Sequence, residues 1–75
     1  MATKANWTHR VVKMARGLQG QWFAFPAALT GTDVDALKAY AEEFAREQTA
    51  AGVVGARVVV LARRGGGCVA EYRIG

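Results

Sequence analysis

Few side chains in this sequence of 75 residues are capable of covalent chemistry. Cys68 is the single cysteine and His9 the single histidine. A cysteine nucleophile needs a nearby base and a group that orients this base. Nothing in the spacing brings Cys68 and His9 together, so we expect Cys68 to be a small buried core residue and His9 a surface or sheet residue. One thiol also excludes an internal disulfide, and one thiol with one imidazole cannot complete a Cys₄ or Cys₂His₂ zinc site.

The acidic and glycine-rich segments give no stronger indication of an active site. Glu42, Glu43 and Glu47 are close in sequence, but adjacent helix positions point apart and Arg46 lies beside them, which is typical of a solvated helix face. Residues 63–68 (RRGGGC) could form an anion-binding nest, but they lack the Lys-Ser/Thr pair of a phosphate-binding loop and the helix after it. We therefore predict a hairpin turn there, and a non-enzymatic protein without catalytic, cofactor-binding or metal-binding residues and without a small-molecule substrate.

The charges are distributed unevenly along the chain. The formal net charge is +4. Residues 33–47 hold five acids and two bases, a net charge of −3, whereas the rest of the chain holds eight bases and one acid, a net charge of +7. Such an asymmetry bears on the choice of partner more than on the fold.

The acidic segment is also the clearest structural element. Apolar residues recur at spacings of three and four between residues 33 and 51, which predicts an amphipathic helix over this range. Thr32 is the expected N-cap, because its hydroxyl can accept a hydrogen bond from the first free backbone amides. Gly52 is the expected C′ glycine.

The residues after the helix alternate as the strands of a hairpin do. A three-residue loop at 65–67 would oppose Val60 to Tyr72 and Val58 to Ile74 and so collect the apolar residues on one face, with Cys68 on the same face. The other face would then carry Arg57, Val59, Leu61, Arg63, Val69, Glu71 and Arg73.

Residues 7–16 and 21–25 predict a second hairpin, before the helix. A four-residue loop at 17–20 would oppose Met14 to Phe23 and Val12 to Phe25 as an inward-facing set. The outward-facing set would then be Trp7, His9, Val11, Lys13, Ala15, Trp22 and Ala24. Pro26 is expected to end strand pairing, with residues 26–32 forming a loop into the helix.

These elements predict a single α+β domain over residues 1–75. The expected architecture is a two-layer sandwich in ββαββ order, with one helix on one face of a four-stranded, largely antiparallel sheet. No segment is apolar over the length that a membrane span needs, and the first residues lack the apolar region of a signal peptide. We therefore expect no membrane association and a cytoplasmic location, where a free thiol is tolerated.

One helix covers one face of such a sheet, so the other face should be open to partners. Its expected mixture of aliphatic, arginine and tryptophan side chains is typical of an interaction surface. The predicted function is a small binding module, such as a regulator, an inhibitor or an accessory subunit, that associates with a larger protein or with a second copy of itself as a homodimer. The predicted interface residues are Val59, Leu61, Val69, Trp22, Arg57 and Arg73.

Two alternatives remain open for the same face. It could bind DNA or RNA, with arginines on phosphates and a tryptophan stacked on bases. The predicted residues for that function are Lys13, Arg16, Arg57, Arg63, Arg64, Arg73 and Trp22. The face could also have no partner, with the tryptophans capping the sheet edges and the arginine stems lying over valines.

Overall fold

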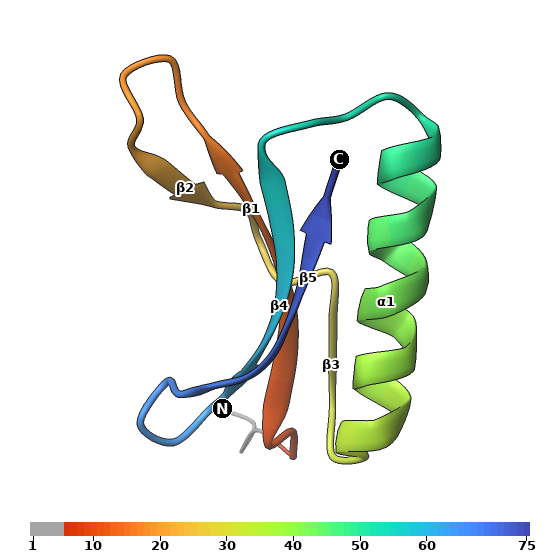
Figure 1. The fold of residues 1–75 in the computed structure, drawn as a ribbon. Coiled ribbons are helices and arrows are strands. Elements are labelled where there is room, and N and C mark those ends of the chain that lie inside the picture. Colours follow the sequence, from red (N-terminus) through yellow and green to blue (C-terminus); the bar gives the residue numbers. More distant parts are fainter. Residues whose placement is uncertain (1–5) are drawn as a thin grey trace.

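The computed structural model describes residues 6–75 and has one helix packed on an antiparallel sheet (Figure 1). The elements are β1 (His9–Arg16), β2 (Trp22–Ala24), β3 (Leu29–Gly31), α1 (Val34–Ala50), β4 (Ala56–Ala62) and β5 (Cys68–Ile74). The strand order is β2-β1-β4-β5, and β3 also pairs with β1. The α+β class is confirmed, but the sheet has five strands instead of four, and the order of elements is βββαββ.

The additional strand, β3, lies where the sequence predicts only a loop. The Phe25 N–H donates to the Lys13 carbonyl at 2.9 Å, and the Ala28 N–H donates to the Val11 carbonyl at 2.8 Å. The chain from β2 to β3 therefore follows one edge of β1 along its whole length. Pro26 has no N–H to donate and interrupts this edge, but pairing resumes beyond it.

Helix α1 begins one residue later than expected. Its N-cap is Asp33, whose Oδ1 accepts a hydrogen bond from the Ala36 N–H at 3.2 Å, so the prediction of Thr32 was wrong. Thr32 and Asp33 are neighbours, and both residue types can cap a helix. At the other end Gly52 has φ +87°, as expected of a C′ glycine.

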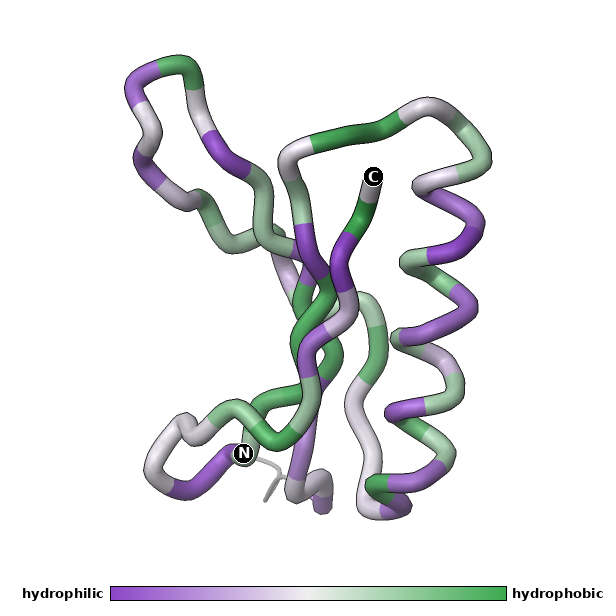
Figure 2. Tube along the Cα trace, in the orientation of Figure 1, coloured by the Kyte–Doolittle hydropathy of each residue, from purple (hydrophilic) through white to green (hydrophobic). Residues whose placement is uncertain are grey.

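The core lies between α1 and one face of the sheet. Its largest fully buried side chains are Val11, Val58, Val60 and Ile74. Leu37, Ala41 and Ala45 of α1 and Ala56 of β4 complete the cluster. The apolar and polar segments of the helix alternate along the Cα trace in Figure 2, as an amphipathic helix requires.

The helix covers only part of the sheet. It contacts β1, β3, β4 and β5 but not β2. The β1–β2 hairpin extends away from α1 (Figure 1). Phe23 and Phe25 therefore remain 52% and 47% exposed, although their register places them on the helix-facing side.

The β4–β5 hairpin keeps the predicted faces with a different register. Val58 pairs with Tyr72 and Val60 with Ala70, two residues away from the predicted partners. The Ala62 N–H donates to the Gly67 carbonyl at 2.8 Å and closes a four-residue loop at 63–66. A four-residue loop by itself would reverse the faces of β5, but a β-bulge restores them, because the pairing shifts between Val60 and Leu61.

The β1–β2 hairpin contradicts the prediction for β1. Ala15 pairs with Phe23 and Met14 with Ala24. The Gly17 N–H donates to the Gln21 carbonyl at 2.7 Å, so the loop is 18–20, with three residues instead of four. Because the register moves by one residue, the odd-numbered residues of β1 (His9, Val11, Lys13 and Ala15) are on the helix-facing side, and its even-numbered residues face outward.

Candidate functional site

We call the sheet face that α1 does not cover the outer face. The register between strands places its side chains: Arg57, on β4, pairs with Met14 of β1 and with Arg73 of β5, and Met14 also pairs with Ala24 of β2. The outer face consists of Arg10, Val12, Met14, Arg16, Trp22, Ala24, Arg57, Val59, Leu61, Cys68, Glu71 and Arg73. It therefore carries four arginines and one glutamate.

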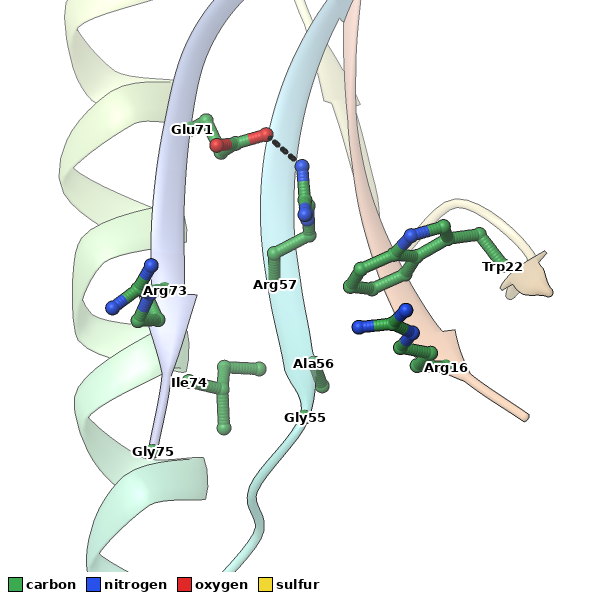
Figure 3. A pocket seen from close by; sticks show the side chains of 9 residues that line it. All are labelled: Arg16, Trp22, Gly55, Ala56, Arg57, Glu71, Arg73, Ile74 and Gly75. Atoms are coloured by element: carbon green, nitrogen blue, oxygen red, sulfur yellow. Dashed lines mark hydrogen bonds and ion pairs between the residues drawn. The ribbon is translucent and has the colours of Figure 1, made fainter. Parts of the chain in front are cut away.

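One end of the outer face is a cationic depression with a volume of about 310 Å³ (Figure 3). Arg16 of β1, Arg57 of β4 and Arg73 of β5 line it, together with Trp22 and Glu71. Strands β1, β4 and β5 thus each contribute one arginine to the lining of this hollow. Such a hollow has the chemistry to receive an anion or several phosphates of one strand.

Arg57 is held at the centre of this depression by two contacts. Its guanidinium carbon lies 4.1 Å from the centroid of the Trp22 ring. Its Nη1 donates to Glu71 Oε2 at 2.7 Å, and both side chains of this ion pair are partly exposed, at 38% and 50%. The two contacts hold the Arg57 side chain in one orientation and keep one face of the indole ring occupied.

The neighbouring depression on the outer face is apolar, with a volume of about 250 Å³. Met14, Val59, Leu61 and Cys68 line it, and it shares Trp22, Arg57 and Glu71 with the cationic depression. The valines of this face, Val12 and Val59, are only 4% and 3% exposed although no helix covers them. The side chains of the outer face therefore already shield most of its apolar centre from water.

The predicted interface residues do not all gather at one place. Trp22, Arg57, Val59 and Leu61 line the apolar depression, and Arg73 lines the cationic one. Val69 has no direct partner in β4, because it lies at the bulge, and it is 47% exposed. None of these residues belongs to the core under the helix.

Of the residues predicted for nucleic acid, Arg16, Arg57, Arg73 and Trp22 lie together. Lys13 does not, because its Nζ donates to Gln48 Oε1 of α1 at 2.7 Å on the helix-facing side. Its prediction as an outer-face residue was therefore wrong, as were those of Val11, His9 and Ala15, which share its side of β1.

Arg63 and Arg64 lie at the opposite end of β4 from the cationic depression. They line a hollow with Trp7, Thr8 and His9, and the Arg63 guanidinium carbon lies 5.2 Å from the centroid of the Trp7 ring. The Thr8 hydroxyl is 2.8 Å from His9 Nδ1. The chain thus pairs an arginine with a tryptophan at each of two separate places.

Arg10, Val12 and Met14 belong to the outer face but were not predicted there. Arg10 pairs with Leu61 and is exposed, so it adds a cation beside the apolar depression. These residues could have been identified from the length of the 18–20 loop, because this length fixes the register of β1 and so decides which of its side chains face outward.

The prediction that Cys68 is buried in the core was wrong. Cys68 is a free, exposed cysteine. The bulge pairs it with Leu61, which moves it from the helix-facing side to the outer face. His9 shares the helix-facing side of β1, so the sheet lies between the Cys68 and His9 side chains.

The two layers of the fold carry opposite charge. The exposed acids Asp35, Glu42, Glu43 and Glu47 project from α1, and Arg46 forms ion pairs within the helix with Glu42 and Glu43. The arginines of the outer face lie on the other side of the sheet. An anionic partner is therefore attracted to the outer face and repelled from the helix.

Neither a metal site nor a membrane-spanning helix is found within residues 6–75. No three or more His, Cys, Asp or Glu side chains of this part of the chain gather as metal ligands would. Its one helix lacks the length and apolar character needed to cross a membrane. Comparison of the chain with protein-family models, with curated proteins and with solved structures finds no match to any of them.

Proposed function

We propose that the protein is a non-enzymatic binding module that holds a single-stranded nucleic acid on its outer face. The observation that carries the proposal is that Arg16, Arg57 and Arg73 line one depression together with Trp22. Arginines bind phosphates through several N–H donors, and an indole ring stacks on an unpaired base whatever its identity. This combination favours a single strand over a duplex, whose bases are already stacked.

Two further features support an anionic partner for this face. The acidic residues of α1 lie on the opposite layer and do not compete for the arginines. A face-to-face homodimer through the outer face would bring four arginines against four arginines and is disfavoured by like-charge repulsion. The burial of Val12 and Val59 within the chain also leaves little apolar area for such a dimer to cover.

The test is a titration of a labelled mixed-sequence oligonucleotide, as single-stranded DNA, single-stranded RNA and duplex DNA. With three phosphate contacts on a single strand, raising the salt concentration from about 50 mM to about 200 mM should weaken binding about 20-fold. Binding that is absent at low salt, or that does not change with salt, would contradict the proposal.

Matched variants distinguish binding at the outer face from a non-specific effect of the net charge of the protein. Arg73→Gln should weaken binding and lower the exponent of the salt dependence by about 0.7. Arg46→Gln removes the same charge from α1 and should leave binding nearly unchanged. Trp22→Leu should weaken binding by about 1–3 kcal/mol, and Trp22→Phe should restore most of the loss because an aromatic ring is retained. Equal losses from Arg73→Gln and Arg46→Gln would locate the binding elsewhere.

The apolar depression supports a second candidate function, association with a larger protein. Met14, Val59 and Leu61 form a hollow next to Arg57, which fits an apolar side chain flanked by carboxylates. Peptides selected from a random library against the protein should then combine an apolar anchor with acidic neighbours. They should lose binding to a folded Leu61→Arg variant, and unchanged binding to this variant would exclude the hollow as the docking site.

We further propose a cytoplasmic location for the protein. Cys68 is exposed and has no cysteine in its own chain to pair with, and such a thiol persists in a reducing compartment. Fractionation of cells that express the protein, followed by detection with an antibody, tests this. Recovery of the chain from an extracellular fraction, cross-linked through Cys68, would contradict it.

A further inference from the structure

The free edge of the sheet lies along β5. The strand order ends at β5, whereas the opposite edge of β1 is occupied by β2 and β3. β5 contains no proline, and its bulge is confined to its first residues, so residues 70–74 form a regular edge. Nothing within residues 6–75 pairs with this edge, and such an edge is a template for another strand.

The hydrogen bonds of β4 show which backbone groups of β5 face outward. The Ala62 N–H points to the β5 side, where it donates to the Gly67 carbonyl, and the Arg63 N–H points to the β1 side, where it donates to the Thr8 carbonyl. Backbone groups alternate between the two edges of a strand. Even-numbered residues of β4 therefore bond to their β5 partners Ala70, Tyr72 and Ile74. The N–H and C=O groups of Glu71 and Arg73 point to the free edge.

The charges along this edge are incompletely paired within the chain. Arg73 lies directly opposite Arg57 in the register, and like charges at this position repel. Glu71 forms its ion pair with Arg57. No acidic side chain within residues 6–75 forms an ion pair with Arg73.

A groove runs beside the same edge on the helix side of the sheet, with a volume of about 550 Å³. Its lining comes from α1 and from the edge strand β5: Glu42, Ala45, Arg46, Thr49 and Ala50 from α1, and Glu71, Tyr72 and Arg73 from β5. Small helix residues leave room for a second element to approach α1 closely. The groove and the edge together offer a strand both hydrogen bonds and a site for its side chains.

We propose that a second copy of this chain occupies this edge, through antiparallel pairing of the two β5 strands about a two-fold axis at Tyr72. This register places Glu71 of each copy opposite Arg73 of the other, so two attractive charge pairs form on the outer face. The same residues carry the outward-pointing backbone groups and would form the main-chain hydrogen bonds across the axis.

Other symmetric registers are less favourable. A shift of one residue would set helix-facing side chains against outer-face side chains. The next register in one direction opposes Glu71 to Glu71, and the next in the other direction opposes Arg73 to Arg73, which are like-charge pairs. The distribution of charge on β5 therefore specifies one register.

The resulting dimer has one continuous sheet with both helices on the same side. Tyr72 of each copy meets its counterpart at the axis, and the two grooves close against each other. The two outer faces join into one surface with twice the arginines of a single chain. The inference does not depend on the proposed nucleic-acid function, although a joined surface would strengthen binding of a longer strand through avidity.

Sedimentation equilibrium without nucleic acid, in the presence of a reductant, tests the proposal. The wild-type protein should show a concentration-dependent shift from the 8.0 kDa of one chain to twice that mass. Arg73→Glu and Glu71→Arg should each weaken dimerisation about tenfold or more, because each creates two like-charge pairs at the axis. Arg10→Glu, a charge reversal on β1 of the same face, is the control and should leave the dimer intact.

Mixing the variants tests the register itself. An equimolar mixture of the Arg73→Glu and Glu71→Arg proteins should form heterodimers, because both charge pairs are then attractive again. In a Cys68→Ser background, Tyr72→Cys should form an intermolecular disulfide on oxidation, since the two positions face each other at the axis. A wild-type chain that is monomeric at all concentrations, or a dimer that ignores both charge reversals, would overturn the proposal, whatever the result of the oligonucleotide titration.

Discussion

The two hairpins of the sheet differ from their predicted registers by different amounts, with opposite consequences. In β4–β5 the register differs by two residues, and every paired side chain from Ala56 to Val60 keeps its predicted face. In β1–β2 it differs by one residue, and all of β1 changes face. Because the side-chain period of a strand is two, the parity of a register error matters more than its size.

The loops explain both registers. The β1–β2 loop has three residues, 18–20, with Gly20 at φ +85° in the left-handed position that such a loop requires. The β4–β5 loop has four residues, 63–66, with Gly65 and Gly66 at φ +76° and +64°. The bulge at Val69 then adds one residue to β5 and restores the even parity. The predicted loop lengths, four and three residues, were thus the reverse of those observed.

The largest expected difference between the two hairpins is in amide exchange. The Phe25 N–H, which bonds to the Lys13 carbonyl, directly follows β2, a strand that α1 does not contact, whereas the Val58 N–H lies in the core between β4 and β5. Local opening of the β1–β2 hairpin should cost much less free energy than unfolding of the core, so Phe25 should exchange at least about 100-fold faster than Val58. Hydrogen–deuterium exchange followed by NMR measures this ratio. Equal protection would mean that the two hairpins open together.

The sequence was enough to predict the buried face of those elements whose charged residues all lie on the other face. In α1, Leu37, Ala41 and Ala45 recur at helical spacing and are buried. In β4, Arg57 marks the outer parity, and Val58 and Val60 lie under the helix as predicted. These parts of the fold followed from periodicity alone.

The sequence did not suffice for β1, because both parities of this strand contain a base. Arg10 and Arg16 share one parity with Val12, and Lys13 shares the other with Val11. Lys13 is accommodated on the helix-facing side because its amine bonds to Gln48 and lies 5.2 Å from the centroid of the Phe25 ring, where the helix leaves the sheet open. The part of the outer face that β1 contributes therefore depended on a loop length that composition does not determine.

The free energy of unfolding of two alanine variants tests which side of β1 faces the helix. Val11 is fully buried against α1, so Val11→Ala should destabilise the fold by about 2 kcal/mol through lost contacts and a cavity. Val12 is on the outer face and outside the cluster under α1, where no helix holds the neighbouring side chains apart, so Val12→Ala should cost about 1 kcal/mol. Urea unfolding of both variants gives the difference. The opposite order would favour the four-residue loop and the predicted register.

Glycine substitutions in the β4–β5 loop isolate the backbone contribution to its turn. No atom lies within 4 Å of a side chain added at Gly66 or Gly67, so neither variant suffers a steric clash. Gly66 has φ +64°, and Gly66→Ala should cost about 1 kcal/mol for the left-handed conformation. Gly67 does not have positive φ, and Gly67→Ala should change stability by less than about 0.5 kcal/mol. Equal costs in urea unfolding would mean that the turn rearranges to tolerate alanine.

The smallest expected effect concerns the contact that ties the two hairpins together. Arg57 of β4 lies over Trp22 of β2 and bonds to Glu71 of β5, so it links the β1–β2 arm to the rest of the outer face. A double-mutant cycle of Arg57→Gln with Trp22→Leu should give a coupling free energy of about 0.5–1 kcal/mol for a partly exposed cation–π pair. The cycle with Glu71→Gln should give about 0.2–1 kcal/mol, because both side chains are partly exposed to water.

Salt separates the two couplings. At about 1 M salt the Debye length is about 3 Å, so the Arg57–Glu71 coupling should fall towards zero. The Arg57–Trp22 contact also excludes water from the ring face and should retain most of its value. If both couplings vanish together, the Arg57–Glu71 ion pair positions Arg57, and the contact of Arg57 with Trp22 of the β1–β2 hairpin depends on this ion pair. If the Trp22 coupling persists, the arm keeps its position on the outer face when Glu71 is engaged by a second chain, and nucleic-acid binding and dimerisation can then occur on the same molecule.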